Sequence, residues 1–136
     1  MSFEELALEL AGAALLEGKE HRPPPLSSKR DERRVAAVAR FMEERFAEPC
    51  ALNDLARLAD LSPFHFLRVF RATTGLTPHQ HLLRTRLRAG AAYLARTDAP
   101  ITEVALAAGF EDLSNFTRSF RAEYGLTPSR YRVQTR

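Results

Sequence analysis

Two arginines fifty residues apart, Arg68 and Arg118, stand among side chains of the types that contact DNA bases. Arginine can donate two parallel hydrogen bonds to O6 and N7 of guanine, and an asparagine such as Asn115 can pair in a similar way with adenine. Thr117 and Leu67 carry methyl groups that fit against the methyl of thymine. This grouping of residue types indicates recognition of base edges in a DNA groove.

The two arginines belong to an internal repeat. Residues 70–78 (FRATTGLTP) match residues 120–128 (FRAEYGLTP) at seven of nine positions. Further upstream, residues 52–59 align with residues 101–108 at an offset of 49 instead of 50, so one residue is inserted ahead of Phe116. Because insertions are tolerated in turns, each copy is predicted to be a helix, a turn and a second helix.

The apolar periodicity predicts helices throughout. Val35, Val38, Met42 and Phe46 recur at steps of three and four, which favours a helix over residues 31–47 that Pro49 ends. Further helices are expected over residues 52–59, 62–74, 77–96, 101–108 and 112–124, with a short one around residues 130–132. No segment alternates with a period of two over the length of a strand. The expected fold is all-α, with two helix-turn-helix subdomains joined by a long linker helix.

In each copy the second helix is expected to enter the major groove with its N-terminal half. These recognition helices are residues 62–74 and 112–124, begun by the N-cap residues Ser62 and Asp112 and ended at Gly75 and Gly125. Base readout is predicted for Phe64, His65, Leu67 and Arg68 in the first copy, and for Leu113, Ser114, Asn115, Thr117 and Arg118 in the second. Ser62, Arg71 and Arg121 are expected at phosphates. The alternative is a plain solvated helix face, which fits two matched copies in a basic domain less well.

The linker helix bears on how the two copies meet DNA. Nineteen helical residues span about 28 Å, and successive major grooves on one face of DNA lie about 34 Å apart. One chain is therefore expected to place its two recognition helices in adjacent grooves. Arg84, Arg86 and Arg88 on this helix are candidates for phosphate contacts or for surface salt bridges.

The net charge of +3 is unevenly distributed. Residues 1–29 hold three Lys or Arg and five Glu, whereas residues 30–136 hold seventeen Arg and twelve Asp or Glu. The basic excess thus lies on the part that carries the repeat. Arginine is the cation best suited to bidentate binding of phosphate or guanine.

Enzymatic and metal-binding readings are less well supported. His79 and His81 are two residues apart, which places them on different helix faces, and Cys50 is the one cysteine. No phosphate loop, nucleophile motif or stretch long enough for a membrane span is present in the sequence. We expect a non-enzyme without cofactor or metal, located in the cytoplasm. A helical protein-interaction module remains a further alternative.

Residues 33–132 resemble the DNA-binding domain of AraC/XylS-type transcription regulators. Two segments carry most of the resemblance: residues 109–121 (GFEDLSNFTRSFR) and residues 125–132 (GLTPSRYR). The resemblance implies seven helices in two subdomains. It also implies that Phe64, Leu67, Arg68, Leu113, Ser114, Asn115 and Arg118 read bases.

Residues 1–29 are expected to form a leucine-rich helix (residues 2–17) and a Pro/Ser linker (residues 18–29), the remnant of a preceding effector or dimerisation domain. The expected partners are double-stranded DNA, a second copy bound through residues 2–17 or through the missing domain, and RNA polymerase if the protein is an activator. A small standalone regulator and the DNA-targeting module of a larger fused protein are the alternatives.

Overall fold

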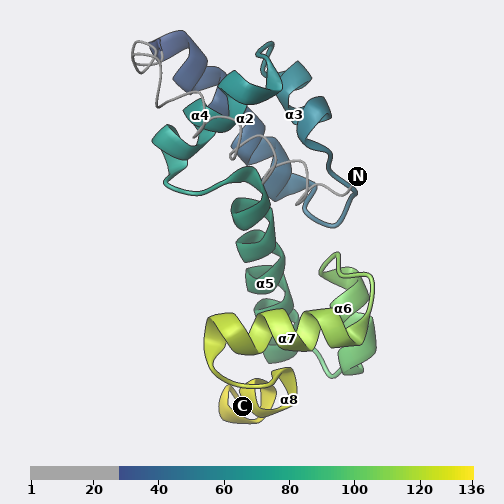
Figure 1. Ribbon diagram of the computed structural model, residues 1–136. Coiled ribbons are helices and arrows are strands. Elements are labelled where there is room, and N and C mark those ends of the chain that lie inside the picture. The colour runs from purple at the N-terminus through teal and green to yellow at the C-terminus, as the bar shows by residue number, and fades with distance from the viewer. Residues whose placement is uncertain (1–27) are drawn as a thin grey trace. The chain divides into compact units, whose positions relative to one another are not determined.

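The computed structural model describes residues 28–136, so the expected helix over residues 2–17 and most of the linker after it lie outside the described part. All regular structure in this part is helical (Figure 1). Its elements are α2 (Lys29–Glu44), α3 (Leu52–Leu58), α4 (Pro63–Thr74), α5 (Pro78–Arg96), α6 (Ile101–Ala107), α7 (Leu113–Tyr124) and α8 (Pro128–Gln134). The predicted all-α class with two helix-turn-helix motifs, α3–α4 and α6–α7, is confirmed.

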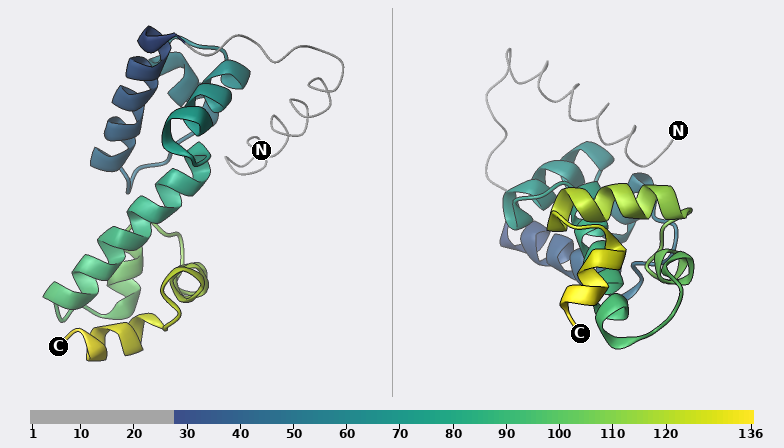
Figure 2. Two further views of the ribbon diagram at one scale, coloured as in Figure 1. Left: turned by 90° about the vertical axis from the view of Figure 1, so that its left-hand side faces the viewer. Right: turned by 90° about the horizontal axis from the view of Figure 1, so that it is seen from below.

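The described chain divides into two compact units, seen from two further sides in Figure 2. Unit 1 contains the described residues up to Glu44 together with Pro49–Leu82, and unit 2 contains Arg45–Glu48 together with Leu83–Arg136. Helix α5 is continuous through the boundary. On either side of this boundary, each unit has its own core and contains one helix-turn-helix motif.

In unit 1, helix α4 packs against α2 and α3. Val35 and Met42 of α2, Leu55 of α3, and Phe66 and Phe70 of α4 are at most 2% exposed. These residues are spaced so that one stripe of each helix is apolar, which is the pattern that buries an amphipathic helix. The hydroxyl of Ser62 accepts a hydrogen bond from the backbone N–H of His65 at 3.1 Å and caps α4.

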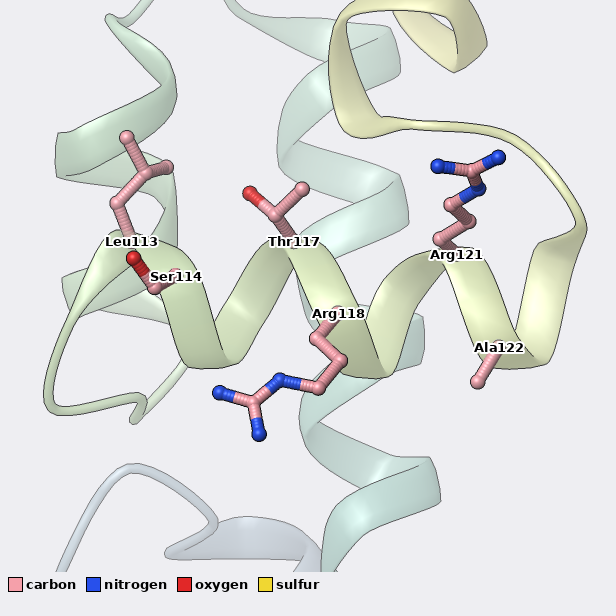
Figure 3. A pocket seen from close by; sticks show the side chains of 6 residues that line it. All are labelled: Leu113, Ser114, Thr117, Arg118, Arg121 and Ala122. Atoms are coloured by element: carbon pink, nitrogen blue, oxygen red, sulfur yellow. The ribbon is translucent and has the colours of Figure 1, made fainter.

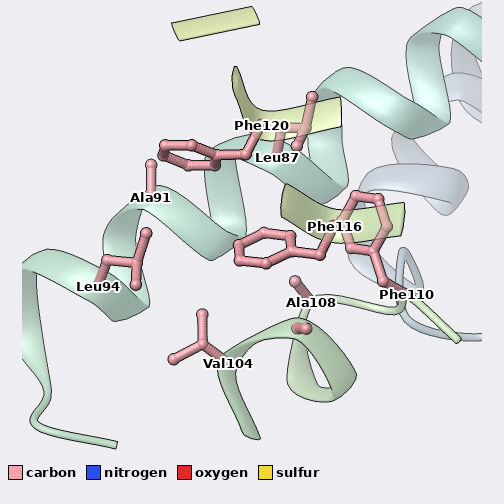
Figure 4. Packing of buried hydrophobic residues seen from close by; sticks show 9 residues of the cluster. Leu87, Ala91, Leu94, Val104, Ala108, Phe110, Phe116 and Phe120 are labelled. Atoms are coloured by element: carbon pink, nitrogen blue, oxygen red, sulfur yellow. The ribbon is translucent and has the colours of Figure 1, made fainter. Parts of the chain in front are cut away.

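In unit 2, two phenylalanines of α7 form the centre of the core (Figure 4). Phe116 and Phe120 have no exposed surface, and they pack with Leu87 and Leu94 of α5 and Val104 of α6. Gly90 permits this close packing, because a Cβ at its position would lie 2.8 Å from the ring of Phe116.

The one-residue insertion lies in the turn of the second motif, as predicted. Helices α3 and α6 begin 49 residues apart, whereas α4 and α7 begin 50 apart. Both turns use the left-handed backbone region, at Asp60 (φ 57°) in the first copy and at Gly109 (φ 97°) in the second. Glycine is suited to the second turn, since a Cβ there would lie 2.8 Å from Nε of Arg86 and 3.0 Å from Cα of Ala47.

Gly109→Ala is expected to lower the free energy of unfolding by about 2 kcal/mol or more, because it adds both backbone strain and a steric clash. The matched control is Asp60→Ala, where an L-residue already occupies the left-handed region. We expect the control to lose less than about 1 kcal/mol. Urea unfolding of both variants measures the difference, and equal losses would contradict this account of the turn.

Helix α2 ends earlier than the sequence predicts. It stops at Glu44, three residues before the expected end at Ala47, and residues 45–48 form a turn. Arg86 donates to the carbonyl oxygen of Phe46 at 2.7 Å and to that of Glu48 at 3.1 Å, so a side chain occupies acceptors of this turn. The sequence predicted a phosphate contact or a surface salt bridge for Arg86, and it did not predict these bonds to backbone carbonyl groups.

The bonds of Arg86 have a counterpart in the second copy. Arg136, fifty positions later, donates to the carbonyl oxygen of Thr97 in the segment that precedes α6, and to the carboxylate of Asp98. Nearby, Arg132 donates to the carbonyl oxygens of Leu94 and Ala99 at 3.1 and 2.7 Å. The internal repeat therefore extends to side chains that hold the backbone ahead of each motif.

Candidate nucleic-acid interface

The exposed face of α7 carries most of the predicted readers of the second copy. Leu113, Ser114, Thr117, Arg118, Arg121 and Ala122 line an open hollow on this helix (Figure 3). Phe116 and Phe120 point into the core. Because residues three or four apart share one face of a helix, Ser114, Thr117 and Arg118 lie together on the face that points outward. Leu113, Ser114, Asn115 and Arg118 are exposed, and Thr117 is partly exposed.

The polar groups on this face are available to an external partner. Among the described residues, no hydrogen bond or ion pair occupies the side chains of Ser114, Arg118 or Arg121. The carboxylate of Asp112 accepts the backbone N–H of Asn115 at 2.7 Å, which caps α7 as predicted and leaves the Asn115 amide group exposed. An arginine, an amide and a hydroxyl are thus exposed on α7.

The corresponding face of α4 is more apolar and more constrained. The guanidinium of Arg68 lies over the ring of Phe64, 6.0 Å from its centroid, and both side chains are partly buried. Such a cation–π contact favours one position of the arginine. Arg71 and Ser62 are exposed, where a phosphate could reach them.

The expected exposure of Leu67 is wrong. Only 6% of this residue is exposed, and it belongs to the core of unit 1 with Phe66 and Phe70. Helix α4 buries Phe66, Leu67, Val69 and Phe70, whereas α7 buries only Phe116 and Phe120. The buried arc is wider because leucine and valine stand where the second copy has Thr117 and Ser119, and an apolar side chain gains free energy by burial. Burial thus leaves Leu67 little surface for contact with a thymine methyl.

His65 is held by a residue of another helix. Its Nε2 atom lies 3.0 Å from Oδ2 of Asp31, in the first turn of α2. The hydrogen bond from His65 is the main cause that holds the pKa of the Asp31 carboxyl below its ordinary value, and the nearby charge of Arg34 acts in the same direction. The side chain of His65 keeps 37% of its surface exposed.

Asp31 is the residue of this site that sequence reasoning missed. The sequence did contain a local signal for the start of α2, because a serine such as Ser28 is a typical N-cap residue. In the structure the hydroxyl of Ser28 accepts the backbone N–H of Asp31 at 3.1 Å. The contact with a residue 34 positions away has no such local signal.

Other kinds of site find little support in this part of the chain. Within residues 28–136, no three His, Cys, Asp or Glu side chains gather closely enough to hold a metal ion. Arg84, considered for phosphate contact or a salt bridge, lies 3.8 Å from the carboxylate of Glu123. None of the described helices has both the length and the apolar character that crossing a membrane requires.

Comparison with known proteins agrees with this geometry. The helix-turn-helix domain family matches residues 55–134. The activator RhaS of Enterobacter sp. (strain 638) is 30% identical over 117 residues, which are 86% of this chain and 39% of that protein. The MmsAB operon regulatory protein of Pseudomonas aeruginosa is 35% identical over 96 residues, 71% of this chain and 31% of that protein. This chain thus spans less than half the length of these curated relatives.

A solved structure provides a further likeness. The DNA-binding domain of AdpA, a global transcriptional factor crystallised in complex with a target DNA, superposes with a TM-score of 0.71 and 31% sequence identity. The match covers 74% of this chain and 90% of that one. A transcriptional regulator of Chromobacterium violaceum with an AraC-type DNA-binding domain superposes with a TM-score of 0.72 and 26% identity, covering 76% of this chain and 93% of that one. Together with the internal repeat, the two helix-turn-helix motifs and the family match over residues 55–134, these likenesses show that the chain belongs to the AraC/XylS-type family of helix-turn-helix transcription regulators.

Proposed function

We propose that residues 30–136 form the part of a transcription regulator that binds double-stranded DNA in a sequence-specific way, with α4 and α7 as recognition helices. The observation that carries this proposal is the outward face of α7. There Ser114, Asn115 and Arg118 are exposed opposite the two buried phenylalanines Phe116 and Phe120. Selection of bound sites from random duplex DNA tests the proposal directly and yields the operator sequence.

The two copies make unequal contributions in this proposal. Helix α7 reads base edges through Leu113, Ser114, Asn115, Thr117 and Arg118, whose side chains are at least partly exposed. Helix α4 contributes Phe64, His65 and Arg68, while Leu67 supports it from within the core. Ser62, Arg71 and Arg121 hold phosphates. Since phosphate contacts position a protein without reading sequence, most of the specificity resides in the second copy.

Phosphate neutralisation should dominate the affinity, because seventeen arginines lie in residues 30–136. With about six phosphate contacts, the slope of log K against log salt concentration should be about −5. Fluorescence titration of a duplex at several salt concentrations measures this slope. A slope near zero would contradict the role given to the arginines.

The length of α5 supports a site with two elements. Its nineteen residues span about 28 Å, close to the distance of about 34 Å between successive major grooves on one face. The readers of the two copies differ, with Phe64 and His65 standing where α7 has Ser114 and Asn115. One chain should therefore favour an asymmetric site whose two elements lie about ten base pairs apart.

Insertion of five base pairs between these elements should reduce specific affinity about tenfold, because half a helical turn moves the second element to the opposite face of the DNA. The control is an insertion of ten base pairs outside the two elements, which keeps their spacing. Competition titration against the selected site measures the effect. Unchanged affinity for the spaced site would mean that one copy alone docks.

The proposal also covers the role of residues 1–29, the oligomeric state, the partners and the location of the protein. Residues 1–29 are the end of a preceding effector or dimerisation domain, through which the protein forms a homodimer. It contacts RNA polymerase as an activator and acts in the cytoplasm without enzymatic activity, cofactor or metal. RhaS is named a transcriptional activator, which supports this reading. The alternative, a DNA-targeting module of a larger fused protein, is not favoured, because RhaS and the MmsAB operon regulatory protein align with 86% and 71% of this chain and are named as regulators. AdaA of Bacillus subtilis, which aligns with 63% of this chain, is named a bifunctional transcriptional activator/DNA repair enzyme.

A further inference from the structure

His65 is held through its backbone and through its ring. Its backbone N–H donates to the hydroxyl of Ser62 at 3.1 Å, which fixes the start of α4. Its ring atom Nε2 lies 3.0 Å from Oδ2 of Asp31. Asp31 is itself held, because its backbone N–H donates to the hydroxyl of Ser28 at 3.1 Å. The two helix caps hold the backbone at both residues, and the packing of α2 against α4 brings this carboxylate to this ring.

The ionisation of the Asp31 carboxyl group determines which ring nitrogen of His65 carries the hydrogen. Asp31 lies in the first turn of α2, where the helix dipole stabilises a negative charge. An ionised carboxylate has no hydrogen to donate, so the short contact requires that Nε2 of His65 is the donor. In the neutral imidazole the other nitrogen, Nδ1, is then an acceptor.

We propose that Asp31 is a positioning residue for base recognition: it keeps the hydrogen of neutral His65 on Nε2, so that Nδ1 meets DNA as a hydrogen-bond acceptor. In the major groove, the groups that donate to such an acceptor are the amino groups of adenine (N6) and cytosine (N4). His65 thus favours a base with an amino group over guanine or thymine on the strand it contacts. This inference rests on the proposed function, because it assumes that α4 enters the groove.

The second copy has no such device. Asn115 stands at the position equivalent to His65, and its amide carries a donor and an acceptor at once. Among the described residues, no side chain of another helix holds the Asn115 amide group, whereas the ring of His65 contacts Asp31 of α2. The preference at the first element therefore depends on a residue of α2, outside the helix-turn-helix motif.

The tautomer can be measured on the free protein. Long-range nitrogen–hydrogen correlation spectra at pH 8, where an ordinary imidazole is neutral, distinguish the protonated nitrogen of His65 from the bare one. We expect hydrogen on Nε2 alone in the native chain and a mixture of both tautomers in Asp31→Ala. The control is Glu32→Ala, which removes the same charge from an exposed neighbour on α2 and should leave the tautomer unchanged. Hydrogen on Nδ1 in the native chain, or an unchanged tautomer in Asp31→Ala, would overturn the proposal.

A second measurement follows the base preference. At pH 8 the native chain is titrated against the selected site and its three substitutions at the base pair contacted by the start of α4. We expect adenine or cytosine to be favoured over guanine and thymine about fivefold, the factor that one net hydrogen bond gives. Asp31→Ala should lose this preference and Glu32→Ala should keep it, although both lose a negative charge that repels DNA.

The two measurements separate the inference from the proposed function. If the chain binds no duplex at low salt, the proposed function fails and the base contact fails with it, whereas the spectra still show whether Asp31 sets the tautomer. If the chain binds its site normally and Asp31→Ala leaves the base preference intact, only the inference is overturned. Thermal unfolding of the two variants, recorded beside the titrations, distinguishes a loss of fold from a loss of preference.

Discussion

Phe116→Ala is expected to lower the free energy of unfolding of unit 2 by about 3–5 kcal/mol, the usual cost of removing a buried phenylalanine ring. The ring has no exposed surface and lies 5.1 Å from the ring of Phe110 and 5.5 Å from that of Phe120, measured between centroids. Its edge also fills the space left by the missing side chain of Gly90. Alanine would leave a cavity that no single neighbour can close. Urea unfolding followed by circular dichroism measures the loss.

The control for this prediction comes from the same helix. Leu113 lies at the start of α7 with 40% of its surface exposed, so Leu113→Ala should cost less than about 1 kcal/mol. If both variants lose the same stability, the core of unit 2 is not organised around α7. A selective loss in Phe116→Ala would support a core of unit 2 that is organised around the buried face of α7.

Arg118→Ala should weaken binding to the selected site by about 1–3 kcal/mol, because the guanidinium is a candidate for bidentate contact with guanine. The loss on random DNA should be much smaller, since only the shared phosphate attraction remains there. Arg118 is exposed on α7 beside Ser114, which can complete a polar contact set. Titration of the specific and the random duplex at one salt concentration measures both losses.

The matched variant is Arg68→Ala, at the equivalent position of the repeat. Arg68 lies over the ring of Phe64 and has few polar neighbours on its face of α4. Its removal should weaken specific and random binding more evenly. If Arg118→Ala loses the same factor on both duplexes, Arg118 anchors a phosphate and the assignment of base reading to it is wrong.

The sequence predicted well those features, such as helix caps, that depend on residues close together in the chain. The hydroxyl of Ser62 and the carboxylate of Asp112 accept backbone N–H groups three residues ahead, and Gly75 and Gly125 end their helices with φ of 78° and 74°. Such caps act within one helical turn, so residue types at short spacing reveal them. The repeat then supplied the correct pairing of the copies, including the longer turn of the second.

Features that depend on distant partners were missed. The end of α2 at Glu44 is accompanied by bonds from Arg86, about forty residues later, to the carbonyl oxygens of the turn. Leu67 is buried although the repeat aligns it with the partly exposed Thr117. A repeat predicts equivalent positions along the chain, but burial also depends on the side chain at each position and on the helices packed around it. The base readers themselves remain predictions.

The turn between α2 and α3 limits how this chain can be divided for study. Residues 45–48 belong to unit 2, although the helices on either side of them belong to unit 1. A recombinant fragment begun at Leu83 would lack both carbonyl acceptors of Arg86 and the backbone that lies against Gly109. A fragment ended at Leu82 would keep this turn without the arginine that holds it. No single cut yields both units intact, so a designer who wishes to exchange one DNA-reading half for another must transplant two separate stretches of sequence.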